Sequence, residues 1–322
     1  MATVVNGWLV IDKPLGVGST QIVSAVKRAL RAGGYPKTKV GHGGTLDPLA
    51  TGVLPIALGE ATKLAGRMLD ADKAYDFTIT FGAATDTIDL EGTVIATSAV
   101  RPTVSELLAI LPHFTGPIAQ VPPAYSAIKI DGERAYDRAR AGETFEIKTR
   151  AVTIQQLSVH PKRSRGTIPS AVEGREPTEE TLTEITLTAR VSKGTYIRSL
   201  ARDIAEALGT VGHVTMLRRT KAGPFTLDQA ISLDKLGELG ETRAVHLARL
   251  PLTAGLDDIP ALPVTPDQAA SLRMGRKQIG IAVPPGLHLA LDAGTPVALV
   301  EQGEQGVRIV RGFNIPDVED IA

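Results

Sequence analysis

The chain has 322 residues, of which 43% are apolar and 22% charged, and its 35 basic and 35 acidic side chains give a formal net charge of zero. It contains no cysteine, which excludes disulfides, thiolate nucleophiles and zinc ribbons, and its six histidines lie too far apart for a helical metal pair. No basic and apolar leader is apparent, and no apolar run approaches the roughly 20 residues that span a bilayer, so we expect a cytoplasmic protein without membrane contact.

The first elements in chain order are a strand and a helix. Residues 7–16, GWLVIDKPLG, predict a short strand that runs into a Pro/Gly turn. A helix follows with Ser19 or Thr20 as its N-cap, because apolar residues recur at intervals of four over 22–30. Residues 73–82 alternate between apolar and polar side chains, which is typical of a half-buried strand.

The middle of the chain mixes both kinds of element. We predict helices over 105–114 and 133–140, and strands over 125–131 and 181–191. Long alternating strands among helices favour an α+β fold with a mixed or antiparallel sheet and flanking helices. Residues 161–181 lack periodicity and are rich in charge, proline and glycine, so we interpret them as an exposed loop inserted between two strands.

A domain boundary is expected near residue 251, where prolines and an acid pair interrupt the pattern. This divides the chain into a main domain, 1–250, and a small β-rich domain, 251–322. The small domain holds five Lys/Arg and nine Asp/Glu, a net charge of −4 that leaves +4 for the rest. The basic residues of the main domain cluster at 27–39, 161–165 and 217–221. Each cluster is either ordinary solvated surface or a contact for an anionic partner such as nucleic acid.

One acid stands out in the stretch GHGGTLDPLATG, where Asp47 follows three glycines and precedes Pro48. Proline disfavours the helical conformation in the residue before it, so we expect Asp47 to be held on a turn. Two interpretations remain open. Asp47 is either the N-cap of a helix that has Pro48 at its first position, or a carboxylate displayed as a nucleophile or base. The second interpretation requires a cationic partner that keeps the carboxylate ionised and oriented.

A candidate partner lies in VSKGTYIRSLARDIAEALG, where a strand ends and a helix begins. Lys193, Tyr196 and Arg198 stand at this junction. An arginine in the first turn of a helix is slightly unfavourable to the helix dipole. We therefore expect Arg198 to have a specific acidic partner, with a solvated surface arginine as the alternative.

Several segments of the chain match the motifs of one known family in their order. They are GWLVIDKPLGVGS, GHGGTLDPLATGVLP, KAYDFTITFGAATDTIDLEG, QVPPAYSAIKIDGERAY, SKGTYIRSLARDIAEALG and GHVTMLRR. Together they resemble the TruB family of pseudouridine synthases over about residues 7–225. The resemblance implies a pseudouridine synthase-like catalytic domain, and the C-terminal part resembles the small PUA-related RNA-binding domain of bacterial members.

The resemblance also implies roles for individual residues. Asp47 matches the catalytic aspartate, Tyr75 a tyrosine that stacks on the base and transfers a proton, and Arg198 an arginine that pairs with the aspartate, which we expect to be bidentate. Tyr75 also fits a purely structural place in the sheet. The substrate-binding residues so implied are His42, Tyr196, Leu217, Lys13 and, in a thumb segment over 120–143, Lys129 and Arg134. Neither a cofactor nor a metal is implied.

The implied reaction is the conversion of uridine 55 in the T-loop of elongator tRNAs to pseudouridine, by base flipping and covalent catalysis. The motifs resemble free-standing bacterial enzymes, so we expect a monomer that acts on the T-stem-loop without a guide RNA. Gly43 and Gly18 depart from the family pattern, which puts the rigidity of their loops in question. Two other functions fit part of the pattern, an RNA chaperone without catalysis and a carboxylate glycosidase, although the glycosidase needs a second acid near Asp47.

Overall fold

The computed structural model describes residues 4–160, 181–277, 283–304 and 306–315. The chain divides into two compact units. The first comprises residues 1–46, 53–69 and 223–322, and the second comprises 47–52 and 70–222. The predicted loop 161–181 lies outside the described residues except for its last residue.

The second unit is built on a sheet whose strands follow the order β12 (Gly212–Ala222), β4 (Lys73–Phe81), β11 (Glu184–Val191), β10 (Arg150–Val159) and β7 (Gly116–Gln120). These neighbours are antiparallel. The first residues of β3 (Ala50–Leu58) add to the edge in parallel, with Ala50 opposite Leu217 and Gly52 opposite Arg219. The sheet is therefore mixed, and the predicted α+β class is confirmed.

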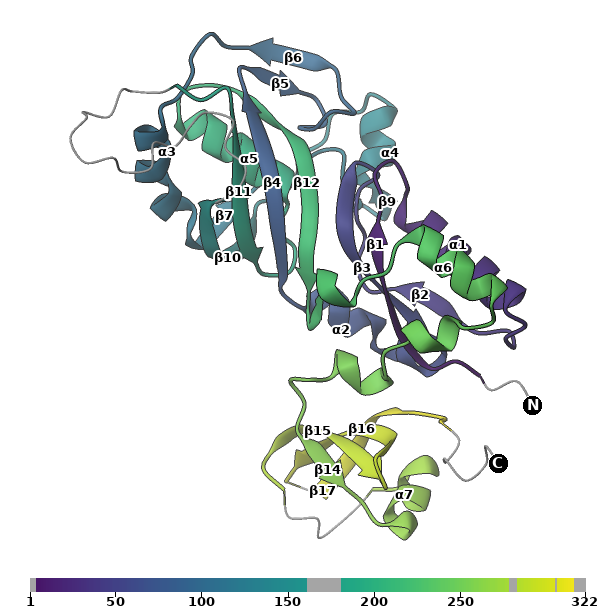
Figure 1. Cartoon of the computed structure of the whole chain (residues 1–322). Helices are drawn as coiled ribbons and strands as arrows, with labels where there is room; N and C mark the ends of the chain where they lie inside the picture. Colours follow the sequence, from purple (N-terminus) through teal and green to yellow (C-terminus); the bar gives the residue numbers. More distant parts are fainter. Residues whose placement is uncertain (1–3, 161–180, 278–282, 305, 316–322) are drawn as a thin grey trace, which may run out of the picture. The chain divides into compact units, whose positions relative to one another are not determined.

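Two helices cover one face of this sheet, α5 (Ile197–Ala207) and α3 (Val104–Ile110) (Figure 1). The alternation of β4 explains the packing, because Phe77 and Ile79 are fully buried against Leu200 and Ile204 of α5. Burial of each such side chain stabilises the fold by about 1.5–3 kcal/mol. The helix start that carries Arg198 is thus fixed against the sheet by apolar contacts.

The first unit contains an N-terminal part and a C-terminal sheet. In its N-terminal part, α1 (Ser19–Ala32) packs on α6 (Leu233–Glu241), and β2 (Val40–His42) pairs antiparallel with the end of β3. β1 (Gly7–Lys13) lies next to β3. The C-terminal sheet and its helix are β14 (Ala261–Pro263), β15 (Gly286–Asp292), β16 (Thr295–Gly303), β17 (Gly306–Gly312) and α7 (Pro266–Arg273). A cluster of buried aliphatic residues holds this part together, as expected of a β-rich C-terminal domain.

The remaining elements are short. They are the strands β5 (Ala83–Thr85), β6 (Val94–Thr97), β8 (Lys129–Ile130), β9 (Glu133–Arg134) and β13 (Phe225–Thr226), and the helices η1 (Gly59–Leu64), α2 (Ala65–Asp70), η2 (Leu111–Phe114), α4 (Ala135–Arg140), η3 (Leu227–Gln229), η4 (Val245–Ala248) and η5 (Leu252–Gly255). Whether the boundary expected near residue 251 delimits an independently folding domain stays a prediction.

Two local predictions were wrong. The N-cap of α1 is Gly18, whose N–H donates to the side chain of Gln21, while Ser19 bonds elsewhere. The strand expected over 125–131 shrinks to Lys129–Ile130, because the backbone before it bends and Tyr136 N–H bonds to the Ser126 carbonyl. The helices over 105–114 and 133–140 are present in substance, as are the strands over 73–82 and 181–191.

Gly52 generates a prediction about stability. Its φ is +101°, and a Cβ added there would lie 2.1 Å from the carbonyl oxygen of Arg219. Gly52→Ala should therefore lower the free energy of unfolding by roughly 2–5 kcal/mol, through strain and displacement of β3 from β12. The measurement is urea denaturation. As a control, Gly237→Ala in α6 has open space around its Cβ and should raise stability by up to about 1 kcal/mol. Equal stability of the two variants would contradict the prediction.

Candidate active site

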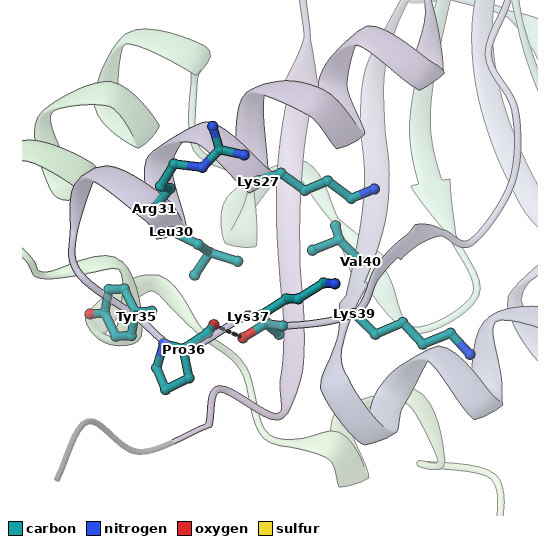
Figure 2. Close-up of a pocket in the computed structure, with 9 residues that line it drawn as sticks. Lys27, Leu30, Arg31, Tyr35, Pro36, Lys37, Lys39 and Val40 are labelled. Atoms are coloured by element: carbon teal, nitrogen blue, oxygen red, sulfur yellow. Dashed lines mark hydrogen bonds between the residues drawn. The ribbon is translucent and has the colours of Figure 1, made fainter.

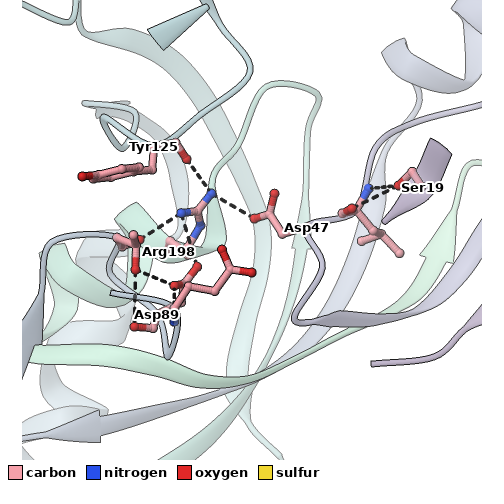
Figure 3. Close-up of polar contacts among 8 residues, drawn as sticks. Ser19, Asp47, Asp89, Tyr125 and Arg198 are labelled. Carbon is pink, nitrogen blue, oxygen red and sulfur yellow. Dashed lines mark hydrogen bonds and ion pairs between the residues drawn. The ribbon is translucent and has the colours of Figure 1, made fainter. Parts of the chain in front are cut away.

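The guanidinium of Arg198 is the centre of the site (Figure 3). Its Nη2 lies 2.9 Å from Asp47 Oδ2 and donates to the carbonyl oxygen of Tyr125 at 2.9 Å. Its Nη1 donates to the carbonyl oxygen of Thr87 at 2.9 Å and lies 3.4 Å from Asp89 Oδ2. The predicted ion pair with Asp47 is present. The expected bidentate geometry is wrong, because the two nitrogens serve two different carboxylates.

Asp89 is the residue of the site that the sequence did not single out. It lies in the loop between β5 and β6 and is only 7% exposed. Its Oδ1 accepts hydrogen bonds from Thr87 Oγ1 at 2.6 Å and from Glu91 N–H at 3.0 Å, which leaves Oδ2 to face Arg198. The preceding Ile88 has φ +62°, a strained conformation for a β-branched residue, and its carbonyl accepts from Val214 N–H at 3.0 Å. Strain and docking onto β12 thus fix the direction of Asp89.

Asp47 lies on a turn rather than at a helix start. Ala50 N–H donates to the Asp47 carbonyl at 3.0 Å, Pro48 and Leu49 form the turn, and β3 begins at Ala50. The helix-cap interpretation of Asp47 is therefore wrong. The residue before Asp47 is held from α1, because Ser19 Oγ donates to the Leu46 carbonyl at 3.0 Å and accepts from Leu46 N–H at 2.9 Å. The Asp47 side chain keeps 44% of its surface exposed, so a substrate can reach it.

A small pocket lies beside the two carboxylates. Its lining includes Asp47, Asp89 and Arg198 and, from β12, Thr215, Met216 and Leu217. The pairing of β12 with β4 is irregular between Val214 and Met216, and such bulges commonly redirect side chains next to active sites. Leu217, predicted to pack near the uracil, is half-buried here and pairs with Ala50 on one side and Phe77 on the other. The pocket therefore combines a charged wall with an apolar one.

The segment 120–143 is anchored at its base by the start of α5. Tyr196 N–H donates to Gln120 Oε1 at 2.8 Å, and Ser199 Oγ donates to the Val121 carbonyl at 2.8 Å. Farther along, Lys129 and Arg134 face each other across the hairpin of β8 and β9, and both are exposed. The two cations are thus carried away from the core, while the base of the segment touches Arg198.

Comparison with known proteins identifies the family. The model of the TruB family pseudouridylate synthase N-terminal domain matches residues 31–197, and that of the tRNA pseudouridylate synthase B C-terminal domain matches 198–250. The chain is 58% identical to tRNA pseudouridine synthase B of Novosphingobium aromaticivorans, over 98% of this chain and all of the relative. It is 55% identical to the protein of that name from Zymomonas mobilis, over 96% of each chain. The chain belongs to the TruB family.

A solved structure supports the fold. A chain from an H/ACA ribonucleoprotein bound to a substrate RNA containing 2'-deoxyuridine matches with a TM-score of 0.68, over 97% of this chain and 86% of its own, at 22% identity. At that identity the likeness concerns the fold alone. No helix among the described residues of this TruB protein is long and apolar enough to cross a membrane. In the same part of the chain, no three His, Asp or Glu side chains form a group that could hold a metal ion.

The TruB resemblance also implied roles for Tyr75, His42 and Lys13. These residues are not among the groups that contact Arg198. Tyr75 is half-buried on β4 and packs against the same core cluster as Leu217. His42 ends β2, opposite Ile56 of β3. Lys13 is fully buried, and its Nζ donates to the carbonyls of Pro14 at 3.0 Å and Val17 at 2.6 Å. These bonds hold the turn after β1, which fits support of a loop better than contact with a phosphate.

Two side chains near Asp47 and Asp89 have shifted pKa values. Burial, followed by the negative charges of Asp89 and Asp47, raises the pKa of Glu91. Burial is also the largest cause that raises the pKa of Tyr196, whose hydroxyl therefore stays protonated at neutral pH. Both shifts favour the neutral form of the group, and burial is the largest cause of each.

The position of Asp89 predicts that its replacement lowers the reaction rate and leaves the affinity for RNA nearly unchanged. Asp89→Asn keeps the shape of the side chain but removes one of the two charges that orient Arg198, so the single-turnover rate should fall about 10- to 100-fold. Affinity for the RNA substrate should stay within about tenfold, or 1.4 kcal/mol. Rate, affinity and melting temperature are measured together.

The matched control is Asp86→Asn in the same loop. Asp86 accepts from Thr93 N–H at 2.9 Å and makes no contact with Arg198. Asp86→Asn should leave the rate unchanged, and an Asp89→Asn protein as active as this control would contradict the assignment.

Lys73 predicts a pH dependence of stability. It begins β4, is 8% exposed and donates to the Ala71 carbonyl at 2.6 Å. Burial, and then the charge of Arg219, lower the pKa of Lys73 to about 8. The unfolded chain holds this proton up to about pH 10.4, so between these values the unfolded state binds more protons and stability rises with pH. Relative to Lys73→Met, the wild type should gain roughly 3 kcal/mol between pH 7.5 and pH 10.5.

Urea denaturation of both proteins across this range measures the difference. Exposed Lys235, paired with Glu238 at 2.9 Å, supplies the control, since Lys235→Met should show no such trend. A difference between wild type and Lys73→Met that does not change with pH would contradict the prediction.

Proposed function

We propose that this TruB protein converts uridine 55 in the T-loop of tRNA to pseudouridine, with Asp47 as the catalytic nucleophile. The observation that carries the proposal is the ion pair between exposed Asp47 and buried Arg198. Asp47 lies in the match to the N-terminal family model, and Arg198 is the first residue of the match to the C-terminal one. A carboxylate on a rigid turn, oriented by a buried cation and open to solvent, is suited to attack a bound substrate.

The reaction is an isomerisation. Asp47 forms a covalent bond to the uridine, the bond between N1 and C1′ breaks, and a bond between C5 and C1′ forms. The bond to Asp47 then breaks, which releases pseudouridine and regenerates the free carboxylate. N1 gains a proton and C5 loses one, so atoms and electrons balance without another reactant. We assign the proton transfer to Tyr75. No cofactor takes part, because the reaction exchanges neither electrons nor atoms with another molecule.

The target nucleotide has to leave the RNA stack before Asp47 can reach it. Flipping costs a few kcal/mol, which contacts with the extruded base must offset. We assign these contacts to Tyr75 and Leu217, which pack on one core cluster. Tyr196, whose protonated hydroxyl can donate a hydrogen bond, and His42 complete the proposed set of contacts with the extruded nucleotide.

The RNA is held outside the catalytic pocket by the thumb, residues 120–143. We assign contacts with phosphates to Lys129 and Arg134, which are exposed on its hairpin. Lys13 supports the turn after β1. We further propose that the protein acts as a monomer in the cytoplasm without a guide RNA, as expected of a relative of bacterial tRNA pseudouridine synthases B.

A glycosidase function has less support. It requires a second carboxylate that can act on the substrate. The second carboxylate that contacts Arg198 is that of Asp89. Its side chain is only 10% exposed, and its oxygens face Thr87, Glu91 N–H and Arg198. Asp89 is therefore a positioning residue for Arg198 rather than an acid that reaches a sugar.

Replacement of Asp47 tests the proposed function. The wild-type protein, alone and in EDTA, should convert one uridine of an unmodified tRNA transcript to pseudouridine. Asp47→Asn should lose turnover by several orders of magnitude, because an amide has the shape of a carboxylate but is not a nucleophile, while tRNA affinity stays within about tenfold. Nucleoside analysis and filter binding measure the two quantities.

The control is Asp203→Asn on α5, which removes an acid paired with Arg202 at 2.7 Å and should retain activity. An active Asp47→Asn protein would remove the catalytic assignment. Tight tRNA binding without any conversion by the wild type would instead favour an RNA chaperone.

A further inference from the structure

A second, larger pocket lies in the first unit of the protein. It has a volume of about 710 Å³, within the range of ligand sites, and shares no residue with the pocket at Asp47. α1 forms one wall and the segment that leads into β2 forms the other (Figure 2). The lining residues are Lys27, Leu30, Arg31, Tyr35, Pro36, Lys37, Thr38, Lys39 and Val40. We call it the α1 pocket.

The charge of the α1 pocket is uncompensated. Four of its nine lining residues are exposed cations, Lys27, Arg31, Lys37 and Lys39, and the sequence from 27 to 39 contains no acid. Within the described residues, none of the four forms an ion pair, whereas Lys63, Arg67 and Lys235 elsewhere in the same unit do. Four unpaired cations around one hollow repel each other and create a positive potential, which an anionic ligand relieves.

The floor of the α1 pocket is apolar and ordered. Leu30 is 4% exposed, and Tyr35, Pro36 and Val40 are half-buried. The Tyr35 hydroxyl donates to the Arg243 carbonyl at 2.8 Å and lies 2.7 Å from His246 Nδ1. These contacts fix the position of the aromatic ring. An apolar floor with a fixed ring offers a surface for a ribose or for the face of a base, which a binding site for a simple inorganic anion does not need.

We propose that the α1 pocket binds backbone phosphates of the RNA substrate, with a sugar or base of the same strand against its floor. The proposal rests on the proposed function, because that function makes RNA the anionic ligand of this protein. Lys27 and Arg31 are one helical turn, about 6 Å, apart on α1, and Lys37 and Lys39 lie on a separate segment. Cations spaced in this way can contact successive phosphates of one strand. The pocket provides affinity and register and takes no part in the chemistry.

A pair of charge-matched double variants tests the proposal. Lys37→Ala with Lys39→Ala removes two cations of the pocket. Arg28→Ala with Arg276→Ala removes two exposed cations that do not line it, so that the net charge changes equally. The pocket variant should bind full-length tRNA about tenfold more weakly near 0.1 M salt, with the slope of log K against log salt reduced by about 1 to 2. The control variant should change affinity less than threefold.

Lysine footprinting adds a direct readout. The complex of tRNA with Asp47→Asn protein is acetylated, and protection of Lys27, Lys37 and Lys39 is compared with that of exposed Lys235, which is paired with Glu238. Protection of the three pocket lysines by tRNA, but not by inorganic phosphate or free nucleotide at the same phosphate concentration, supports the proposal. Protection by the small anions alone would assign the pocket to a small ligand and overturn it.

Failure of this proposal is distinguishable from failure of the proposed function. The pocket variant should keep the wild-type single-turnover rate at saturating tRNA, so activity reports on the catalytic site alone. Equal weakening by the pocket and control variants, or no protection of the pocket lysines, would overturn the α1 pocket as an RNA site while conversion of uridine continues. Unchanged melting temperatures of both variants show that folding is intact.

Discussion

One buried guanidinium organises the catalytic unit. Arg198 is 6% exposed and is bonded to groups from three other segments, the turn of Asp47, the loop of Thr87 and Asp89, and the base of the thumb at Tyr125. A buried charge that loses a partner costs several kcal/mol, so each segment is tied to the position of the others. The geometry at Asp47 therefore depends on residues far along the chain and not on its own turn alone.

Exposure separates the roles of the two carboxylates that share Arg198. The side chain of Asp47 is 44% exposed and that of Asp89 10%, although both contact the same guanidinium. Burial raises the pKa of nearby Glu91, and the negative charges of Asp89 and Asp47 raise it further, so a third ionised acid is unfavourable here. The site accordingly disfavours additional anions near Asp47, whereas a neutral base such as uracil carries no such penalty.

The features that the sequence predicts correctly are those that a short stretch of residues determines by itself. Period-2 alternation located β4 and β11, Pro48 located the turn of Asp47, and a cation set against the helix dipole singled out Arg198. Asp89 was missed because its stretch contains several acids, and only the docking of its loop on β12 selects one of them. Ser19 was predicted as a cap because its type favours caps, but long-range bonds to Leu46 hold it instead. What depends on contacts between distant segments has no local signal.

The two walls of the pocket at Asp47 differ in how freely their side chains can move. The pocket beside Asp47 has a volume of about 20 Å³, enough for a single water molecule. The charged wall cannot yield without separating Arg198 from its carboxylates, which is costly for a buried ion. The other wall consists of half-buried Met216 and Leu217 on an irregular stretch of β12, whose apolar side chains can change rotamer without breaking an ion pair. The apolar wall is therefore the one that can adapt to a ligand at the lower cost, because its movement leaves the ion pairs of Arg198 intact.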